Sequence, residues 1–317
     1  MSDSVPELSL RDFTAGDAGA RAAFAQALFA GLTRFGFVIL RDHNVAPDLL
    51  ARAYALAGDL FARPEAEKRR HAAGLRGYTP FRTEHAKDSA VADLKEFWQI
   101  GRERDGAFAA QMPAADFPAN VWPPDDGPDG LPAFRETFLA LYAALDETGR
   151  LLLRALAPRL GYAPDHFDPL VRDGTSILRV LHYPPVPDDA EPGAVRSAAH
   201  EDINFLTIMV AAMGAGLELL DRSGAWRSVA ADPSRLIVNS GDMLQRLTAG
   251  VIPSTTHRVV NPAGPNVSRY SMPFFMHPAS DVSLKVLPSC EDARPPQPEI
   301  TAGEFLAERL RAIGLAS

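Results

Sequence analysis

Hydrophobic residues recur at helical spacing in three separate segments of the chain. The first lies within residues 17–35 and begins at Asp17, a residue type that commonly caps a helix N-terminus. The second runs from 49 to 61. The third and longest places leucine and phenylalanine on one stripe between 131 and 156 and ends at Gly161. We therefore expect three helices, the last of them long enough to brace one face of a sheet.

After residue 174 the pattern changes to short apolar runs separated by Pro, Gly, Asp and Asn. This spacing is typical of antiparallel strands and not of alternating strands and helices. We therefore predict an α+β fold: a double-stranded β-helix (jelly roll) core with an N-terminal helical region and the long bracing helix. The predicted core strands are Ser176–Val180, His200, Phe205–Val210, Leu217–Leu220, Trp226–Ser228, Leu236–Val238, Met243–Leu247, His257–Val260, Arg269–Met276 and Val282–Val286.

The length and composition fit one large catalytic unit. The chain has 317 residues, of which 46% are hydrophobic and 23% charged. That is enough to bury a sizeable core and to carry a helical appendage. We expect residues 1–110 to form an N-terminal helical region that packs on the core, and residues 111–317 to form the jelly-roll core.

The charge and the cysteine content limit the partners. A formal net charge of −8 disfavours a nucleic acid or an anionic membrane as partner. The single cysteine, Cys290, cannot form an intrachain disulfide and fits a reducing compartment. We see no secretory pattern at the start of the chain and no run long enough to span a membrane. We expect a cytoplasmic location and a small-molecule substrate, whereas the sequence is silent on oligomeric state.

The segment from 197 to 210 contains the residue types of a metal site. His200 and Asp202 are two positions apart, so in an extended segment both side chains point to the same face. His257, on another predicted strand, offers a second imidazole. Two imidazoles and one carboxylate on a triangular face hold a divalent metal and leave coordination positions open, which suits Fe(II) and dioxygen chemistry.

A possible anion site follows on a later strand. Arg269 and Ser271 lie two positions apart, and together they offer a fork of N–H donors and a hydroxyl. These groups suit a carboxylate on a small co-substrate. A salt bridge between Arg269 and a carboxylate of the protein is the structural alternative.

A second His-x-Asp pair, His166 and Asp168, shows how weak this motif is by itself. It lies between two prolines, which favours a short surface helix or turn. By itself, the pair at His200 and Asp202 would also be explained as a hydrogen-bonded strand pair. The ordered set of His-x-Asp, a second histidine and Arg-x-Ser favours the metal site.

In this set of motifs the chain resembles the iron(II)/2-oxoglutarate-dependent oxygenases of the isopenicillin N synthase-like group. It departs from them at Leu181, where many plant members carry asparagine, and at Glu201 and Ile203, where smaller or aromatic residues are more common. These departures concern the substrate and not the metal. Further matching segments are Gly36–Leu40 with His43, then Phe61, Pro64 and Lys68, then Arg76–Tyr78, Asp93–Glu96, and Leu178–Pro185 with its Tyr-Pro motif.

The resemblance implies an enzyme that hydroxylates or otherwise oxidises a small molecule and releases succinate and CO2. Fe(II), 2-oxoglutarate and dioxygen are the implied cofactor and co-substrates. Arg258 adjoins a metal ligand and is expected to be a supporting or structural charge. The implied metal ligands are His200, Asp202 and His257, and the implied 2-oxoglutarate contacts are Arg269, Ser271 and Tyr183.

Three alternatives remain open at this point. The first is an iron oxidase of the same fold that uses no 2-oxoglutarate, as isopenicillin N synthase itself does. The second is a non-catalytic jelly roll that binds a metal or a small acid, although a complete set of ligands disfavours it. The third is a zinc hydrolase. That class lacks a placed general base, because Glu201 would point away from the metal face of a regular strand.

Overall fold

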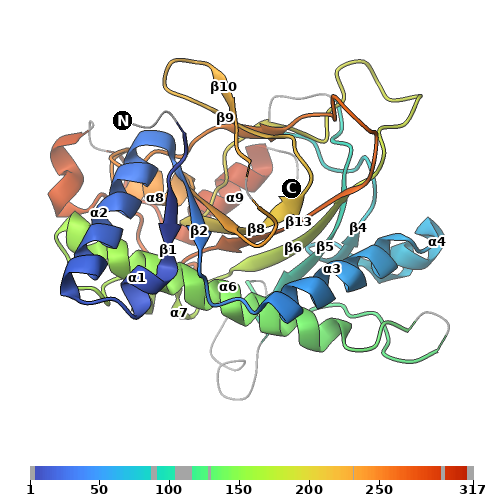
Figure 1. The fold of residues 1–317 in the computed structure, drawn as a ribbon, viewed down its shortest axis with the longest axis horizontal. Helices are drawn as coiled ribbons and strands as arrows, with labels where there is room; N and C mark the ends of the chain where they lie inside the picture. The colour runs from blue at the N-terminus through green and yellow to red at the C-terminus, as the bar shows by residue number, and fades with distance from the viewer. Residues whose placement is uncertain are drawn as a thin grey trace.

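The computed structural model describes residues 4–86, 91–103, 116–127, 130–230, 232–293 and 297–312. Two sheets face each other within this part of the chain, and the predicted α+β jelly-roll architecture is confirmed (Figure 1). In the larger sheet only β1 and β2 pair in parallel. Its nine strands, in spatial order, are β1 (Glu7–Ser9), β2 (Phe37–Arg41), β11 (Leu236–Ser240), β8 (Leu206–Met213), β13 (Arg269–Met276), β6 (Ile177–Tyr183), β5 (Glu96–Gly101), β4 (Arg76–Thr79) and β3 (Ala72–Ala73).

The smaller sheet is antiparallel throughout. It carries both histidines of the predicted metal site. Its strands, in spatial order, are β10 (Trp226–Ser228), β9 (Leu217–Leu220), β12 (His257–Val259) and β7 (Ser197–His200).

The helix of residues 18–35 begins and ends at capping residues. The Asp17 carboxylate accepts a hydrogen bond from the amide of Ala20 at 2.8 Å, and the same helix ends at Gly36, whose φ is 67°. The long apolar stripe forms the predicted bracing helix. The described helices are α1 (Leu10–Thr14), α2 (Ala18–Phe35), α3 (Pro47–Phe61), α4 (Glu65–Lys68), α6 (Phe134–Leu156), α7 (Asp168–Arg172), α8 (Asp242–Leu247) and α9 (Ala302–Ala312), with 3-10 turns at Arg69–His71, Ala157–Leu160 and Pro288–Ala293.

Alternation along the strands divides the core into two layers. On β8 and β13, even-numbered residues such as Ile208 and Phe274 pack in the main cluster together with residues of α2, α3 and α6. Odd-numbered residues on β2 and β6, such as Phe37 and Leu181, belong to a second cluster with Leu219 and other residues of the smaller sheet. Because successive strand side chains point to opposite faces, the helices cover one face of the larger sheet and the other face lines the space between the sheets.

Two predicted strands are wrong. Met243–Leu247 lies in helix α8, where Met243, Leu244 and Leu247 are buried at helical spacing. Val282–Val286 is not a strand, because only Ser283 forms a bridge, to Thr301. A short apolar run does not distinguish a strand from a buried helix, which is why the first prediction failed. The other predicted core strands are found: three have the predicted bounds, and the ends of the rest are shifted by up to three residues.

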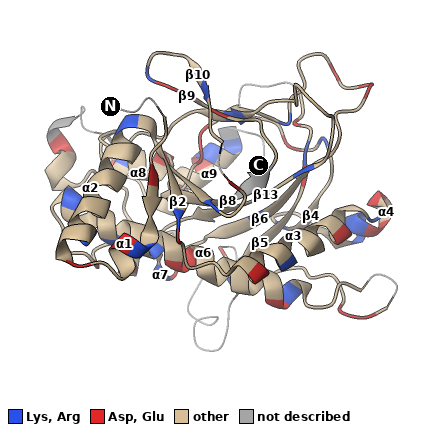
Figure 2. Ribbon diagram, viewed as in Figure 1, with Lys and Arg blue, Asp and Glu red and all other residues tan. Residues whose placement is uncertain are grey.

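The division of the chain at residue 110 falls outside the described residues and stays a prediction. Strands β1 and β2, from the N-terminal region, join the larger sheet next to β11. Figure 2 shows acidic and basic residues interspersed along α3 and α4, whereas the charged residues of α2 are both arginines. None of the described helices combines the length and the apolar character that crossing a membrane requires.

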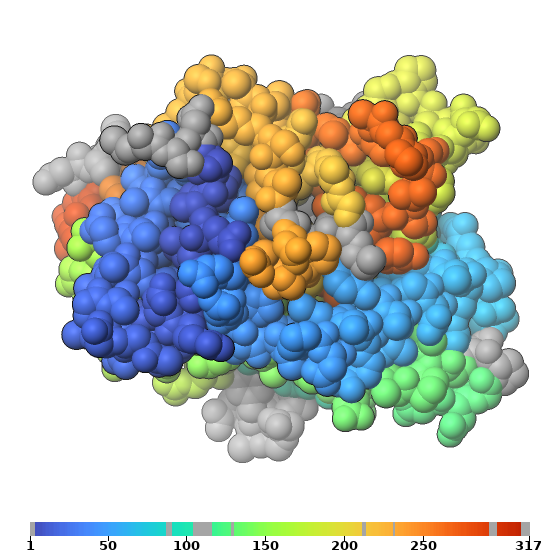
Figure 3. All heavy atoms as spheres, in the orientation of Figure 1, coloured from blue at the N-terminus to red at the C-terminus, as the bar shows by residue number. Residues whose placement is uncertain are grey.

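The loop of residues 184–193 runs beside the segment that leads into β13. The Asn266 side chain bonds both to the amide and to the carbonyl oxygen of Val186, at 2.7 and 2.8 Å. Figure 3 shows the two segments together at the upper right, in yellow-green and orange. Asp189 reaches Arg82 across 3.2 Å, which ties the loop to the other rim of the same end of the molecule.

Candidate metal and co-substrate site

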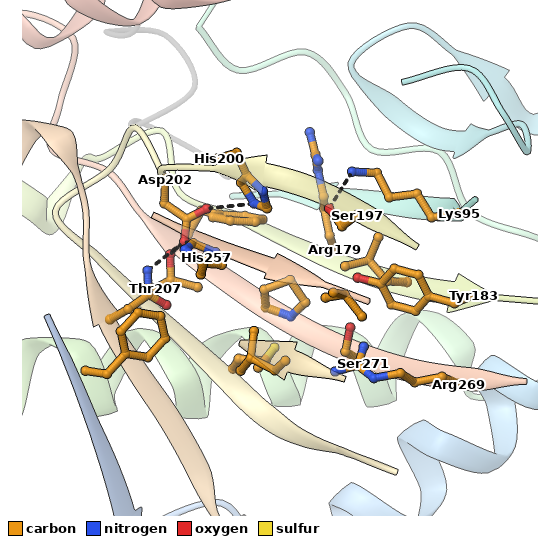
Figure 4. Close-up of a pocket in the computed structure, with 18 residues that line it drawn as sticks. Lys95, Arg179, Tyr183, Ser197, His200, Asp202, Thr207, His257, Arg269 and Ser271 are labelled. Carbon is orange, nitrogen blue, oxygen red and sulfur yellow. Dashed lines mark hydrogen bonds and ion pairs between the residues drawn. The ribbon is translucent and has the colours of Figure 1, made fainter. Parts of the chain in front are cut away.

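His200, Asp202 and His257 come together at one end of the space between the sheets (Figure 4). One potential ligand atom from each of them lies within 4.8 Å of the other two. His200 Nε2 is 3.9 Å from Asp202 Oδ1, and His257 Nε2 is 3.8 Å from Asp202 Oδ2. The histidines are register partners in the antiparallel pair of β7 and β12. The structure therefore brings together all three predicted metal-ligating side chains.

Main-chain carbonyl groups orient both imidazoles. His200 Nδ1 donates to the oxygen of Ala198 at 2.7 Å, and His257 Nδ1 donates to the oxygen of Thr255 at 3.0 Å. A carbonyl accepts only an N–H, so each neutral ring has its unprotonated Nε2 toward Asp202. Burial, and the repulsion that two protonated imidazoles would exert on each other, lower the pKa of His200, which favours this neutral form.

Two side chains from neighbouring strands hold the Asp202 carboxylate. Its Oδ2 accepts hydrogen bonds from Thr207 Oγ1 at 2.6 Å and from Asn239 Nδ2 at 2.8 Å. Burial opposes ionisation of Asp202, but His257, His200 and these two donors keep its pKa below the usual value. The sequence analysis did not identify Thr207 and Asn239, because no strand or helix periodicity relates either residue to Asp202.

His200 and Asp202 do not lie on one extended strand, as the sequence analysis assumed. Strand β7 ends at His200, and Asp202 lies beyond it, where its main-chain oxygen accepts a hydrogen bond from the amide of Asp242 at 2.7 Å. The chain therefore turns toward α8 at the position where the second ligand is needed. Glu201 is exposed and accepts a hydrogen bond from Thr256, so it points away from the three ligands, as expected.

Arg269, Ser271 and Tyr183 lie across the pocket from the three ligands (Figure 4). Arg269 is register partner to Tyr183, and its guanidinium carbon lies 5.0 Å from the centre of the Tyr183 ring. Arg269 is 2% exposed, yet among the described residues its Nε and Nη1 have no hydrogen-bond partner, and neither has the buried Ser271 Oγ. Among the described residues, no carboxylate lies within 4.0 Å of Arg269, so the salt-bridge alternative is not found there.

Unpaired buried donors are rare in folded proteins, so these three atoms indicate a missing acceptor. A carboxylate would satisfy a guanidinium fork and a hydroxyl at the same time. The set of two imidazoles and one carboxylate also fits a metal such as Fe(II) with open coordination positions. The side chains present thus fit both groups that the sequence resemblance implied.

A third wall of the pocket carries charges that sequence reasoning did not assign. Lys95 Nζ lies 2.7 Å from Glu84 and 2.8 Å from Asp93. The Arg179 guanidinium bonds to Gln99 Oε1 at 2.6 Å and pairs with Glu84 at 3.1 Å. Lys95 and Arg179 line the pocket, so the segment around Glu84 and strand β5 borders it.

Two other sequence candidates lie away from the pocket. Arg258 pairs with Glu218 at 2.7 Å and lies over the Trp226 ring at 3.9 Å, which is a structural role in the smaller sheet. His166 is in a turn against Tyr162, and Asp168 begins α7 and pairs with Arg154 at 2.7 Å. The second His-x-Asp pair therefore takes no part in the metal site.

Known proteins match the chain along almost its full length. The 2OG-Fe(II) oxygenase superfamily matches residues 174–278, and the N-terminal part of the non-haem dioxygenases in morphine synthesis matches residues 5–125. A 2-oxoglutarate-Fe(II) type oxidoreductase of Aspergillus fumigatus is 32% identical over 96% of this chain and 92% of that protein.

Solved structures give the same result. A 2OG-Fe(II) oxygenase family protein from Caulobacter crescentus is 41% identical, with a TM-score of 0.85 over 99% of this chain and 100% of that one. A full-length protein of Neurospora crassa, in complex with alpha-KG and thymine, is 26% identical, with a TM-score of 0.85 over 98% of each chain. These relatives favour the 2-oxoglutarate-dependent enzyme over the oxidase, binding-module and zinc-hydrolase alternatives.

The facial set of ligands, the orphan donors opposite it and these relatives converge on one enzyme class. The chain belongs to the 2-oxoglutarate/Fe(II) oxygenase superfamily and is a dioxygenase that depends on Fe(II) and 2-oxoglutarate.

Proposed function

We propose that the three ligands hold Fe(II) and that the orphan donors opposite them bind the far carboxylate of 2-oxoglutarate. The observation that carries this proposal is the pair of unsatisfied nitrogens on a guanidinium that is almost fully buried. The ligand side chains are His200, Asp202 and His257, and the carboxylate contacts are Arg269, Ser271 and Tyr183.

In this proposal the protein orients its reactants and excludes water. When bound, Fe(II) with 2-oxoglutarate supplies the dioxygen chemistry and the release of succinate and CO2. Thr207 and Asn239 hold Asp202 Oδ2, which leaves Oδ1 for the metal. Leu181 and Phe275 add apolar walls, which strengthen electrostatic interactions inside the pocket by keeping water out.

The substrate is proposed to be a small molecule that lies against the wall formed by Lys95, Arg179 and Ser197. Relatives support a small substrate: the Neurospora crassa protein is seen with thymine and with 5-formyluracil, and a relative in Petromyces alliaceus is named a proline hydroxylase. The polar groups of this wall suit a substrate that forms hydrogen bonds. A cytoplasmic location is part of the same proposal, and the buried free thiol of Cys290 is consistent with it.

The test is an anaerobic titration of the protein with Fe(II) and then with 2-oxoglutarate, followed by visible absorption of the metal-bound 2-oxo acid. We expect the band to vanish in His257→Ala. We expect Arg269→Gln to need at least about tenfold more 2-oxoglutarate, because a charge-assisted pair is lost. Arg154→Gln, which removes the partner of Asp168 far from the pocket, is the control and should titrate as the unmodified protein does.

The titration can also contradict the proposal. Tight Fe(II) binding without a band at millimolar 2-oxoglutarate would show that the orphan donors serve another acid. An unchanged 2-oxoglutarate titration in Arg269→Gln would leave the metal assignment in place and reject the assignment of the carboxylate contacts.

A further inference from the structure

A second buried arginine, Arg196, is next in sequence to Ser197, which lines the pocket. It immediately precedes β7 and is 3% exposed. Its Nη2 donates to the main-chain oxygen of Val267, and its Nε has no hydrogen-bond partner in the part of the chain that the structure describes. Within the described ranges, no carboxylate lies within 4.0 Å of its guanidinium. A buried charge is costly unless it is paired, so Arg196 needs a counter-ion that this part of the protein does not supply.

The position of Arg196 points to the source of that counter-ion. The next residue, Ser197, lines the pocket together with Tyr183 and Arg269. Val267, which accepts the hydrogen bond from Arg196, lies two residues before Arg269 on the segment that enters β13. Burial lowers the pKa of Arg196, and the positive charge of Arg269 lowers it further. The hydrogen bond to Val267 ties Arg196 to the segment that leads directly into Arg269.

The other cations of the pocket already have anions. Lys95 is paired with Glu84 and Asp93, and Arg179 is paired with Glu84. Arg196 and Arg269 are the two buried cations of this region that lack a carboxylate among the described residues. The excess positive charge thus gathers at one end of the pocket, next to Tyr183.

We propose that Arg196 is a positioning residue for 2-oxoglutarate, which shares the charge of the far carboxylate with Arg269 and fixes the start of β13 through Val267. The inference rests on the proposed function, because it takes the carboxylate at Arg269 as given. It predicts that Arg196 distinguishes a 2-oxo acid with a charged tail from one with an uncharged tail. A purely structural arginine would not make this distinction.

The chain offers a matched control for this test. Arg76 on β4 is also 3% exposed and donates to a main-chain oxygen, that of Leu75, and its Nε has no partner among the residues described. Burial lowers its pKa as well. Arg76 does not line the pocket. Arg76→Gln therefore removes a comparable buried charge without changing the charge at the co-substrate site.

The experiment measures dissociation constants for 2-oxoglutarate and for 2-oxopentanoate on the anaerobic Fe(II) enzyme, by visible absorption and by calorimetry. 2-Oxopentanoate keeps the chelating end and lacks the far carboxylate. In Arg196→Gln we expect about tenfold weaker binding of 2-oxoglutarate, the size of one charge interaction in a partly buried site. Binding of 2-oxopentanoate should stay within about twofold. Arg196→Lys should bind 2-oxoglutarate more tightly than Arg196→Gln, and Arg76→Gln should change neither constant.

Two results would overturn the inference. Equal weakening of both acids in Arg196→Gln would make the residue structural, and no weakening of either would remove it from the site. If Arg196→Gln does not fold, Arg196→Lys decides, because a loss of binding for both acids in that variant contradicts a role through charge. Arg269→Gln tests the proposed function separately. If Arg269→Gln weakens the binding of 2-oxoglutarate selectively and Arg196→Gln does not, only the role of Arg196 is rejected.

Discussion

His200 and His257 face each other across the antiparallel pair of β7 and β12, with their ring centres 4.4 Å apart. Sheet hydrogen bonds fix the two main chains at this position. A main-chain carbonyl, that of Ala198 or Thr255, fixes each ring. The two imidazole rings are thus oriented by the main chain without a bound metal. Asp202, by contrast, is oriented by the side chains of Thr207 and Asn239.

The first prediction uses the internal duplicate of the His-x-Asp motif. His200→Ala should lose at least about a hundredfold in Fe(II) affinity, because it removes one of three protein ligands. His166→Ala, which alters the other copy of the motif, should keep it unchanged. Calorimetric titration with Fe(II) under argon compares the two variants. Retained affinity in His200→Ala would mean that the metal binds elsewhere.

The second prediction concerns the support of the carboxylate ligand. Thr207→Val keeps the side-chain shape and removes the 2.6 Å hydrogen bond to Asp202 Oδ2. Loss of such a supporting partner typically weakens metal binding about 10–100-fold. We expect a loss in that range in a calorimetric Fe(II) titration, with the 2-oxoglutarate requirement unchanged once Fe(II) is saturating.

The control for this change is the same substitution at another buried threonine. Thr148 in α6 donates to Asn44 Oδ1 at 2.5 Å and does not line the pocket. Thr148→Val should therefore bind Fe(II) as the unmodified protein does. An unaffected metal affinity in Thr207→Val would show that Asn239 alone orients the carboxylate.

The sequence predicted the parts of the site that depend on order and residue type. The alternation on β13 placed Arg269 and Ser271 on one face, and the structure has both lining the pocket. The same alternation on β6 puts Arg179 and Tyr183 there. Within one strand, a two-residue period is enough to predict which side chains share a face.

The supporting residues could not be predicted, because they depend on the register between strands. Asn239 reaches Asp202 only because β11 pairs with β8 so that Asn239 is opposite Thr207. Arg196 precedes a strand and follows a loop, with no periodic neighbour that would mark it as buried. The run Met243–Leu247 is apolar and short, and the Gly241-Asp242 pair before it is the signal that would have favoured a helix.

The third prediction tests the contact of the bracing helix with the sheet. A Cβ atom at Gly149 in α6 would lie 2.5 Å from Met276 Cε and 3.1 Å from Ile208 Cδ1. Overpacking of this kind costs about 1–3 kcal/mol, so Gly149→Val should lower the free energy of unfolding by that amount. Gly58 in α3 has no atom within 4 Å of such a Cβ. The control Gly58→Val should therefore change stability by less than about 0.5 kcal/mol in the same denaturant titration. Equal effects in both variants would show that helix propensity and not packing decides.

The fourth prediction is a pH dependence that originates at the charged pocket wall. The Glu84 side chain is 10% exposed and lies between Lys95 and Arg179. Burial alone would raise its pKa, but these two cations lower it from the usual 4.5 to about 2. A carboxyl group with a lower pKa in the folded state stabilises the protein above its unfolded pKa. That stabilisation is lost as the pH falls from about 4.5 to about 2.

Glu84→Gln removes this titration while it keeps the side-chain size. The free energy of unfolding at pH 7 should fall by about 3 kcal/mol at most, which is the energetic equivalent of the pKa shift of Glu84. The decrease should be smaller if Asp93 by itself neutralises Lys95. Between about pH 5 and pH 3 the unmodified protein should lose stability more steeply than the variant, because its unfolded state takes up a proton at Glu84 that its folded state does not. Glu136→Gln on the exposed side of α6 should leave the slope as it is. If the stability of Glu84→Gln and of the unmodified protein changes with pH in parallel, then Asp93 and Gln99 are enough to orient Lys95 and Arg179, and Glu84 does not contribute to stability.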